Sequence, residues 1–215
     1  MSAYDVVLFQ GDFITDCGRF RDNEGTPNDL GALGQGYPLM AAVHLQSAMP
    51  DAGLRFFNRC ISGQRIVDLY ARIKADFINL QPSLISILVG VSDTWREFPR
   101  KNGVPVPKYA RIFRELLNEI RMELPEVKLV LCEPFVLKCG VVTNEWIEEM
   151  NQRLAIVAKL ALEFGATFIP FLSMFDEAVK KAPAAYQAGD GVHPTAAGHM
   201  LMAKKWIQLV KGCRS

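Results

Sequence analysis

Asp190 and His193 are the residues of this chain whose types and spacing best suit acid–base chemistry. Across one turn, a carboxylate can accept the imidazole Nδ1–H. That bond fixes the tautomer and leaves Nε2 as a general base. Pro194 favours the first turn of a helix directly afterwards, so His193 stands at a stiff junction. The alternative is an aspartate that caps this helix beside a surface histidine.

Phe13 occupies the position that the first predicted strand directs toward a site. The apolar run 6–9 stops at Gly11-Asp12 and is typical of a strand buried on both faces of a parallel sheet. Sites in open α/β sheets lie where such strands end. A benzyl group has no lone pair that a histidine could activate. We expect the neighbouring Asp12 and Asp16 to cap and bond the loop backbone.

Four further apolar runs predict strands, and amphipathic segments between them predict helices. The strands are expected at 54–58, 84–89, 128–132 and 167–169, and the clearest helices at 38–49, 109–124, 144–164, 174–181 and 195–211. Residues 17–36 and 96–107 are expected to be loops. Strands that alternate with helices require a parallel sheet covered on both faces. The predicted fold is an α/β, three-layer, flavodoxin-like sandwich with a five-stranded parallel sheet.

The composition describes an ordinary globular chain of 215 residues, which we expect to form one domain over residues 1–215. A net charge of +1, from 24 basic and 23 acidic residues, gives no reason to expect nucleic acid or a membrane as partner. No segment is suited to secretion or to spanning a bilayer, so a cytoplasmic location is expected. The odd number of cysteines and their spacing favour free thiols and predict no metal site: Cys17, Cys60, Cys132, Cys139 and Cys213.

Four segments resemble, block by block and in order, the SGNH (GDSL-type) hydrolases, and the resemblance covers nearly the whole chain. They read Gly-Asp-Phe-Ile-Thr-Asp at 11–16, Asn-Arg-Cys-Ile-Ser-Gly at 58–63, Gly-Val-Ser-Asp-Thr-Trp at 90–95 and Asp-Gly-Val-His-Pro at 190–194. The resemblance implies the strand order 2-1-3-4-5 and a parent activity of hydrolysing small carboxylic esters, including acetyl esters of carbohydrates. It also favours His193 with Asp190 as a catalytic pair over the capping alternative.

Three departures from the family pattern fall on three site positions while their neighbours match. The family's serine nucleophile, whose N–H is also an oxyanion donor, is here Phe13, which retains only the N–H. Cys60 stands where relatives have glycine, and Ser92 where they have the asparagine that donates to the oxyanion. Gly63, whose N–H is the remaining donor in the family, is retained. Because drift would erode the flanks as well, this pattern indicates replacement at the site.

Three hypotheses follow. The chain is an inactivated or engineered esterase, or it is a rebuilt enzyme in which Cys60 or Ser92 is the nucleophile with His193 and Asp190. The third hypothesis is a non-catalytic binder with Phe13 as an apolar floor. The rebuilt enzyme requires a sulfur or oxygen within about 4 Å of an imidazole nitrogen. We expect a small ester or related ligand and no cofactor. A homo-oligomer stays open, as does whether the replacements are natural.

Overall fold

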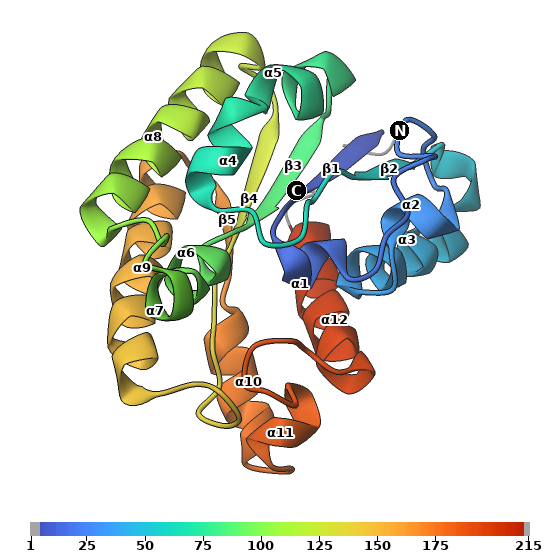
Figure 1. Ribbon diagram of the computed structural model, residues 1–215. Coiled ribbons are helices and arrows are strands. Elements are labelled where there is room, and N and C mark those ends of the chain that lie inside the picture. Colours follow the sequence, from blue (N-terminus) through green and yellow to red (C-terminus); the bar gives the residue numbers. More distant parts are fainter. Residues whose placement is uncertain (1–4, 213–215) are drawn as a thin grey trace.

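Five parallel strands form one sheet in the computed structural model, which describes residues 5–212 (Figure 1). Their order is β2-β1-β3-β4-β5, which confirms the predicted fold and strand order. The strands are β1 (Val6–Gly11), β2 (Arg55–Asn58), β3 (Leu84–Leu88), β4 (Lys128–Cys132) and β5 (Thr167–Ile169). The registers are regular, with Val7 of β1 opposite Phe56 of β2 and Leu84 of β3.

Helices cover both faces of the sheet because alternate strand residues point in opposite directions. The longer helices are α3 (Tyr37–Ala48), α8 (Val106–Glu123), α9 (Asn144–Glu163), α10 (Phe171–Val179) and α12 (Ala196–Gly212). The shorter ones are α1 (Phe13–Asp16), α2 (Leu30–Leu33), α4 (Ile66–Ala71), α5 (Ile73–Asp76), α6 (Val91–Trp95), α7 (Glu97–Arg100), α11 (Ala184–Gln187) and the 3₁₀ turns η1 (Pro50–Ala52) and η2 (Ile78–Leu80). Val7 and Phe9 of β1 belong to the core under α3, α10 and α12, whereas Val6 and Leu8 belong to the core under α4, α5, α8 and α9. The chain is thus a three-layer sandwich.

The two segments predicted to be loops contain short helices. Residues 17–36 include α2, and residues 96–107 include α7 and the start of α8. The first turn of a helix tolerates proline, because the N–H groups of that turn have no partner within the helix. Pro99 therefore fits in α7, and Pro107 lets α8 begin three residues before the predicted Tyr109.

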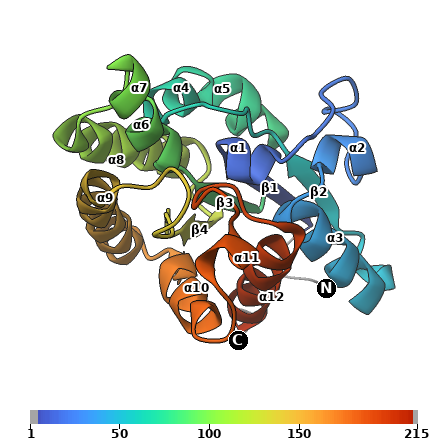
Figure 2. The same ribbon diagram turned by 60° about the horizontal axis from the view of Figure 1, so that its bottom comes forward.

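The turn out of β1 depends on Gly11. Its φ is +158°, and a Cβ built there would lie 2.1 Å from the carbonyl oxygen of Leu88 at the end of β3. Only glycine allows the two strand ends to lie this close before the chain turns into α1. Figure 2, in which this edge of the sheet comes forward, shows the segment before α12 passing close to α1. Within residues 5–212, every helix is too short or too polar to cross a lipid bilayer.

Candidate active site

Asp12 fixes the turn on which Phe13 is presented. Its carboxylate accepts the N–H of Ile14 at 3.2 Å, as the N-cap of α1, and the N–H of Ser92 at 3.3 Å. Burial raises the pKa of this carboxyl to about 7, and the two N–H groups oppose that rise. The predicted capping role of Asp12 is confirmed, and the same residue ties the first block to the third.

The Asp190–His193 pair forms at the other side of the site. His193 Nδ1 lies 2.6 Å from Asp190 Oδ2, while Asp190 Oδ1 accepts the N–H groups of Val192 at 2.9 Å and His193 at 2.7 Å. Partial burial raises the pKa of Asp190, but these bonds outweigh it and bring the pKa below its usual value. The ionised carboxylate therefore accepts the Nδ1–H and orients the ring, which leaves Nε2 for proton transfer.

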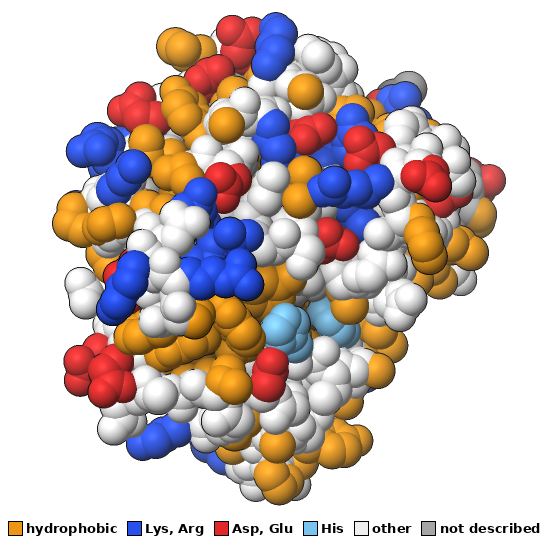
Figure 3. All heavy atoms as spheres, in the orientation of Figure 1, with side chains coloured by type: hydrophobic (Ala, Val, Ile, Leu, Met, Phe, Trp, Pro, Cys, Tyr) orange, Lys and Arg blue, Asp and Glu red, His pale blue; other side chains and the backbone are white. Residues whose placement is uncertain are grey.

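The Phe13 ring packs directly on the His193 imidazole. The two ring centroids are 4.4 Å apart with an interplanar angle of 38°. The Trp95 ring packs against both rings, with its centroid 6.0 Å from that of Phe13 and 5.5 Å from that of His193. Figure 3 shows hydrophobic surface next to the histidines on this face. The imidazole is thus held as a base would be, but it faces an aromatic ring where a reacting hydroxyl would be needed.

Cys60 and Ser92 are both buried side chains, and among the described residues neither forms a hydrogen bond with His193. The Cys60 side chain is fully buried, and burial raises the pKa of its thiol well above the usual value. The Ser92 hydroxyl is also buried and has no hydrogen-bond partner among the described residues. Neither group offers a substrate an exposed nucleophile activated by the Asp190–His193 pair. Tyr109 is likewise a buried core residue, and its hydroxyl donates to the Val89 carbonyl.

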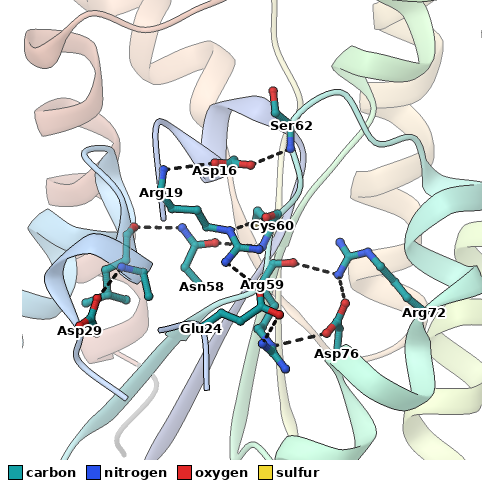
Figure 4. Close-up of polar contacts among 12 residues, drawn as sticks. Asp16, Arg19, Glu24, Asp29, Asn58, Arg59, Cys60, Ser62, Arg72 and Asp76 are labelled. Atoms are coloured by element: carbon teal, nitrogen blue, oxygen red, sulfur yellow. Dashed lines mark hydrogen bonds and ion pairs between the residues drawn. The ribbon is translucent and has the colours of Figure 1, made fainter. Parts of the chain in front are cut away.

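A polar network holds the second block in place (Figure 4). The buried Arg19 side chain donates from Nε to the Cys60 carbonyl at 2.5 Å and pairs with Glu24 at 3.1 Å. Arg59 pairs with the same Glu24 at 2.8 Å and with Asp76 at 3.4 Å. The network joins the 17–36 segment to the end of β2, which rigidifies the backbone around Cys60.

Asp16 makes a second connection between the first and second blocks. Its carboxylate accepts the N–H of Ser62 at 2.7 Å and the N–H of Arg19 at 3.3 Å (Figure 4). The loop role predicted for Asp16 is confirmed. Since Ser62 immediately precedes Gly63, this bond helps to fix the backbone that carries the expected oxyanion N–H.

A cleft of about 430 Å³ lies beside the Phe13–His193 contact and includes two residues not predicted to belong to the site, Cys17 and His199. The other lining residues are Ile14, Asp16, Gly18, Gln35, Ser62 and Pro194. The i,i+4 spacing of Phe13 and Cys17 could have indicated that both share one face of a helical turn. No comparable spacing pointed to His199, because it lies on α12, far from Phe13 in the sequence. Its side chain is buried. Within residues 5–212, no group of three or more side chains could hold a metal ion.

A five-stranded parallel sandwich with an aspartate–histidine pair beside its strand ends is the arrangement expected of an SGNH-type ester hydrolase scaffold. Residues 11–201 match the model of the GDSL-like lipase/acylhydrolase family, so the chain belongs to that family. The chain is similar to the acetylxylan esterase of Geobacillus stearothermophilus, with 36% identity over 210 residues that cover 95% of this chain and 93% of the relative.

Solved structures agree with this assignment. A GDSL-like lipase from Parabacteroides merdae superposes with a TM-score of 0.93 at 37% identity, covering 96% of this chain and 95% of that one. The Geobacillus acetylxylan esterase superposes with a TM-score of 0.86 at 34% identity, covering 96% and 94%. Catalytic mutants of that enzyme replace a serine, an aspartate and a histidine with alanine, and the aspartate and histidine lie three positions apart.

Proposed function

We propose that this protein is a non-hydrolytic member of the family that binds a small acyl ester, with acetylated carbohydrate as the ligand class. The packing of Phe13 against His193 at 4.4 Å carries the proposal. The ring occupies the space next to the base and offers it no hydroxyl. The carbohydrate part of the proposal rests on the similarity to the acetylxylan esterase.

The Asp190–His193 pair would orient a bound ester. A neutral imidazole whose Nδ1–H is taken by Asp190 presents Nε2 as an acceptor to a ligand hydroxyl. Phe13 and Trp95 add an apolar wall, which suits the acetyl methyl or the face of a sugar ring. The site therefore retains recognition chemistry after loss of the nucleophile.

The test is ester turnover by the parent chain and by a matched pair of variants. The parent should release no more than about one equivalent of nitrophenol from excess nitrophenyl acetate. Phe13→Ser should raise turnover by at least about 100-fold, and adding Ser92→Asn should raise it by roughly 100- to 1,000-fold more through the restored oxyanion donor. Sustained turnover by the parent would refute the proposal.

Ligand binding is tested separately, by titrating the parent with acetylated and deacetylated xylo-oligosaccharides in a calorimeter. The acetylated ligand should bind at least about tenfold more tightly, because its acetyl group packs against the apolar wall of Phe13 and Trp95. Phe13→Ala is the matched variant and should lose most of that preference. Equal affinity for the two ligands would exclude acyl recognition.

A further inference from the structure

A thiol and an imidazole that the proposed function does not use face one another in the cleft. Cys17 Sγ lies 3.2 Å from His199 Nε2, and both residues line the cleft together with Phe13 and His193. Cys17 closes the C-terminus of α1, where its N–H donates to the Phe13 carbonyl. The thiol is therefore one helical turn from the position at which the family's nucleophile is expected.

The backbone fixes the tautomer of His199. The N–H of Tyr37 donates to His199 Nδ1 at 3.2 Å, so Nδ1 is the unprotonated nitrogen and the proton is on Nε2. Burial keeps the ring neutral by lowering the pKa of His199 to about 4. His199 thus donates Nε2–H to the sulfur and does not act as its base. This arrangement favours negative charge on Cys17 when the thiol ionises.

Gly36 makes room for the contact between the Cys17 and His199 side chains. A Cβ at this position would lie 2.9 Å from the Cys17 Cβ and 3.0 Å from His199 Cε1. Because Gly36 has no side chain, the start of α3 fits between the two residues and brings the Tyr37 N–H to His199. Cys17 itself has a left-handed backbone conformation, with φ of +38°. This conformation is unfavourable for a residue other than glycine, so the surrounding structure must hold it in place.

Cys17 is the partly exposed cysteine that lines this cleft. Cys60 and Cys132 are buried, and the Cys139 thiol is bonded elsewhere, donating to the Ala188 carbonyl at 3.3 Å. Burial and the adjacent Asp16 raise the pKa of Cys17, so the thiolate is a minor species at neutral pH. A thiolate is nevertheless intrinsically a far stronger nucleophile than an alcohol.

We propose that Cys17 is a covalent acceptor in the cleft, taking a small acyl group from an activated ester and holding it as a thioester. The thiol proton passes to solvent, and the His199 Nε2–H stays on the ring and bonds the thiolate. The sulfur attacks the carbonyl carbon, a C–S bond forms and the ester C–O bond breaks. The alcohol or phenol leaves as its oxyanion and is protonated by water. This inference rests on the proposed function for the class of ligand that enters.

The experiment uses the full chain with Cys139→Ser and Cys213→Ser, so that Cys17 is the accessible thiol left among the described residues. After treatment with excess nitrophenyl acetate, peptide mass mapping should find one acetyl group on Cys17. Neutral hydroxylamine should remove it, as it removes thioesters but not lysine amides. Acetylation should be at least about tenfold faster in the folded chain than in guanidinium, because the cleft positions the ester.

Two matched variants distinguish the outcomes. Adding Cys17→Ser should abolish the hydroxylamine-sensitive acetyl group, and adding His199→Leu, which removes the N–H donor, should shift the pH midpoint of iodoacetamide alkylation at Cys17 upward. Acetylation that is no faster in the folded chain, or that falls on another residue, would overturn the proposal. Those results leave the proposed function standing, since that function is contradicted by sustained release of nitrophenol or by equal affinity for the acetylated and deacetylated ligands.

Discussion

The aspartates of the first and last loops of the site have pKa values shifted in opposite directions. Asp12 is fully buried, and its pKa rises to about 7, whereas Asp190 is partly exposed, bonded by two N–H groups and His193, and its pKa falls below the usual value. Asp12 positions backbone, and Asp190 holds an ionised partner for an imidazole. The last loop thus has the geometry of a working base, while the first loop places the Phe13 ring beside that base.

The largest expected effect tests whether the last loop can still function. In the Phe13→Ser/Ser92→Asn variant, a further His193→Ala should lower ester turnover by roughly 1,000-fold or more, because serine and histidine act as one unit. Turnover is measured with nitrophenyl acetate. His44→Ala, which removes an exposed histidine of α3 bonded to Lys211, is the control and should change nothing. Unchanged turnover in His193→Ala would show that the last loop is not a base.

The next effect concerns the buried carboxyls near the first loop. Burial raises the pKa of Asp93 to about 7, against the opposing influence of Arg153 and the Ile66 N–H. The unfolded group ionises near its ordinary value, so folding is favoured at low pH and loses that advantage as pH rises from about 4 to about 7. Asp93→Asn should reduce the loss of unfolding free energy between pH 5 and pH 8 by about 3 kcal/mol, measured by urea unfolding at both pH values.

Asp190→Asn should change the pH dependence in the opposite direction. The lowered pKa of Asp190 stabilises the fold at neutral pH, and that stabilisation is lost as pH falls through the folded-state pKa. The variant and the parent should therefore differ in stability at pH 7 and converge in acid. Parallel curves across this range would remove the contrast between the two aspartates.

A smaller effect tests how the first loop is held. Glu24→Gln should cost about 2 kcal/mol of unfolding free energy, because the buried Arg19 loses its ionic partner and the nearby Arg59 retains only Asp76. Asp5→Asn is the matched control: it breaks the exposed pair with Arg55 and should cost about 0.5 kcal/mol. Both values come from urea unfolding. Equal costs would mean that the network does not stabilise the loop.

The smallest effect isolates the aromatic ring. Phe13→Leu keeps an apolar side chain but removes the ring contacts with His193 and Trp95, so it should cost about 1 kcal/mol. Phe20→Leu is the control, since that ring is 69% exposed and should contribute little. A negligible cost for Phe13→Leu in urea unfolding would mean that the ring fills space beside His193 without stabilising the site.

The fold was predictable because each strand is a short apolar run, and the first three strands end at a recognisable block. Asp190 and His193 were predictable for a related reason, since the residues that make their contact lie within one turn. The ranges 17–36 and 96–107 were only partly predictable, because prolines and polar residues there start short helices as readily as they form loops.

The remainder of the site depends on contacts between distant segments. The Arg19–Cys60 hydrogen bond joins residues 41 positions apart in the sequence, and the Cys17–His199 contact joins residues 182 positions apart. Neither follows from local periodicity, and the thiol that lines the cleft was therefore overlooked in favour of the one that departs from the family block.

Asp190 does two tasks with one side chain. Oδ2 orients the imidazole, while Oδ1 secures the peptide N–H groups of Val192 and His193. Because the second task shapes the loop whether or not any bond is ever cleaved, selection for folding alone would preserve the aspartate. The presence of two of the three residues of a catalytic triad in a family member is accordingly poor evidence that the member still turns over a substrate.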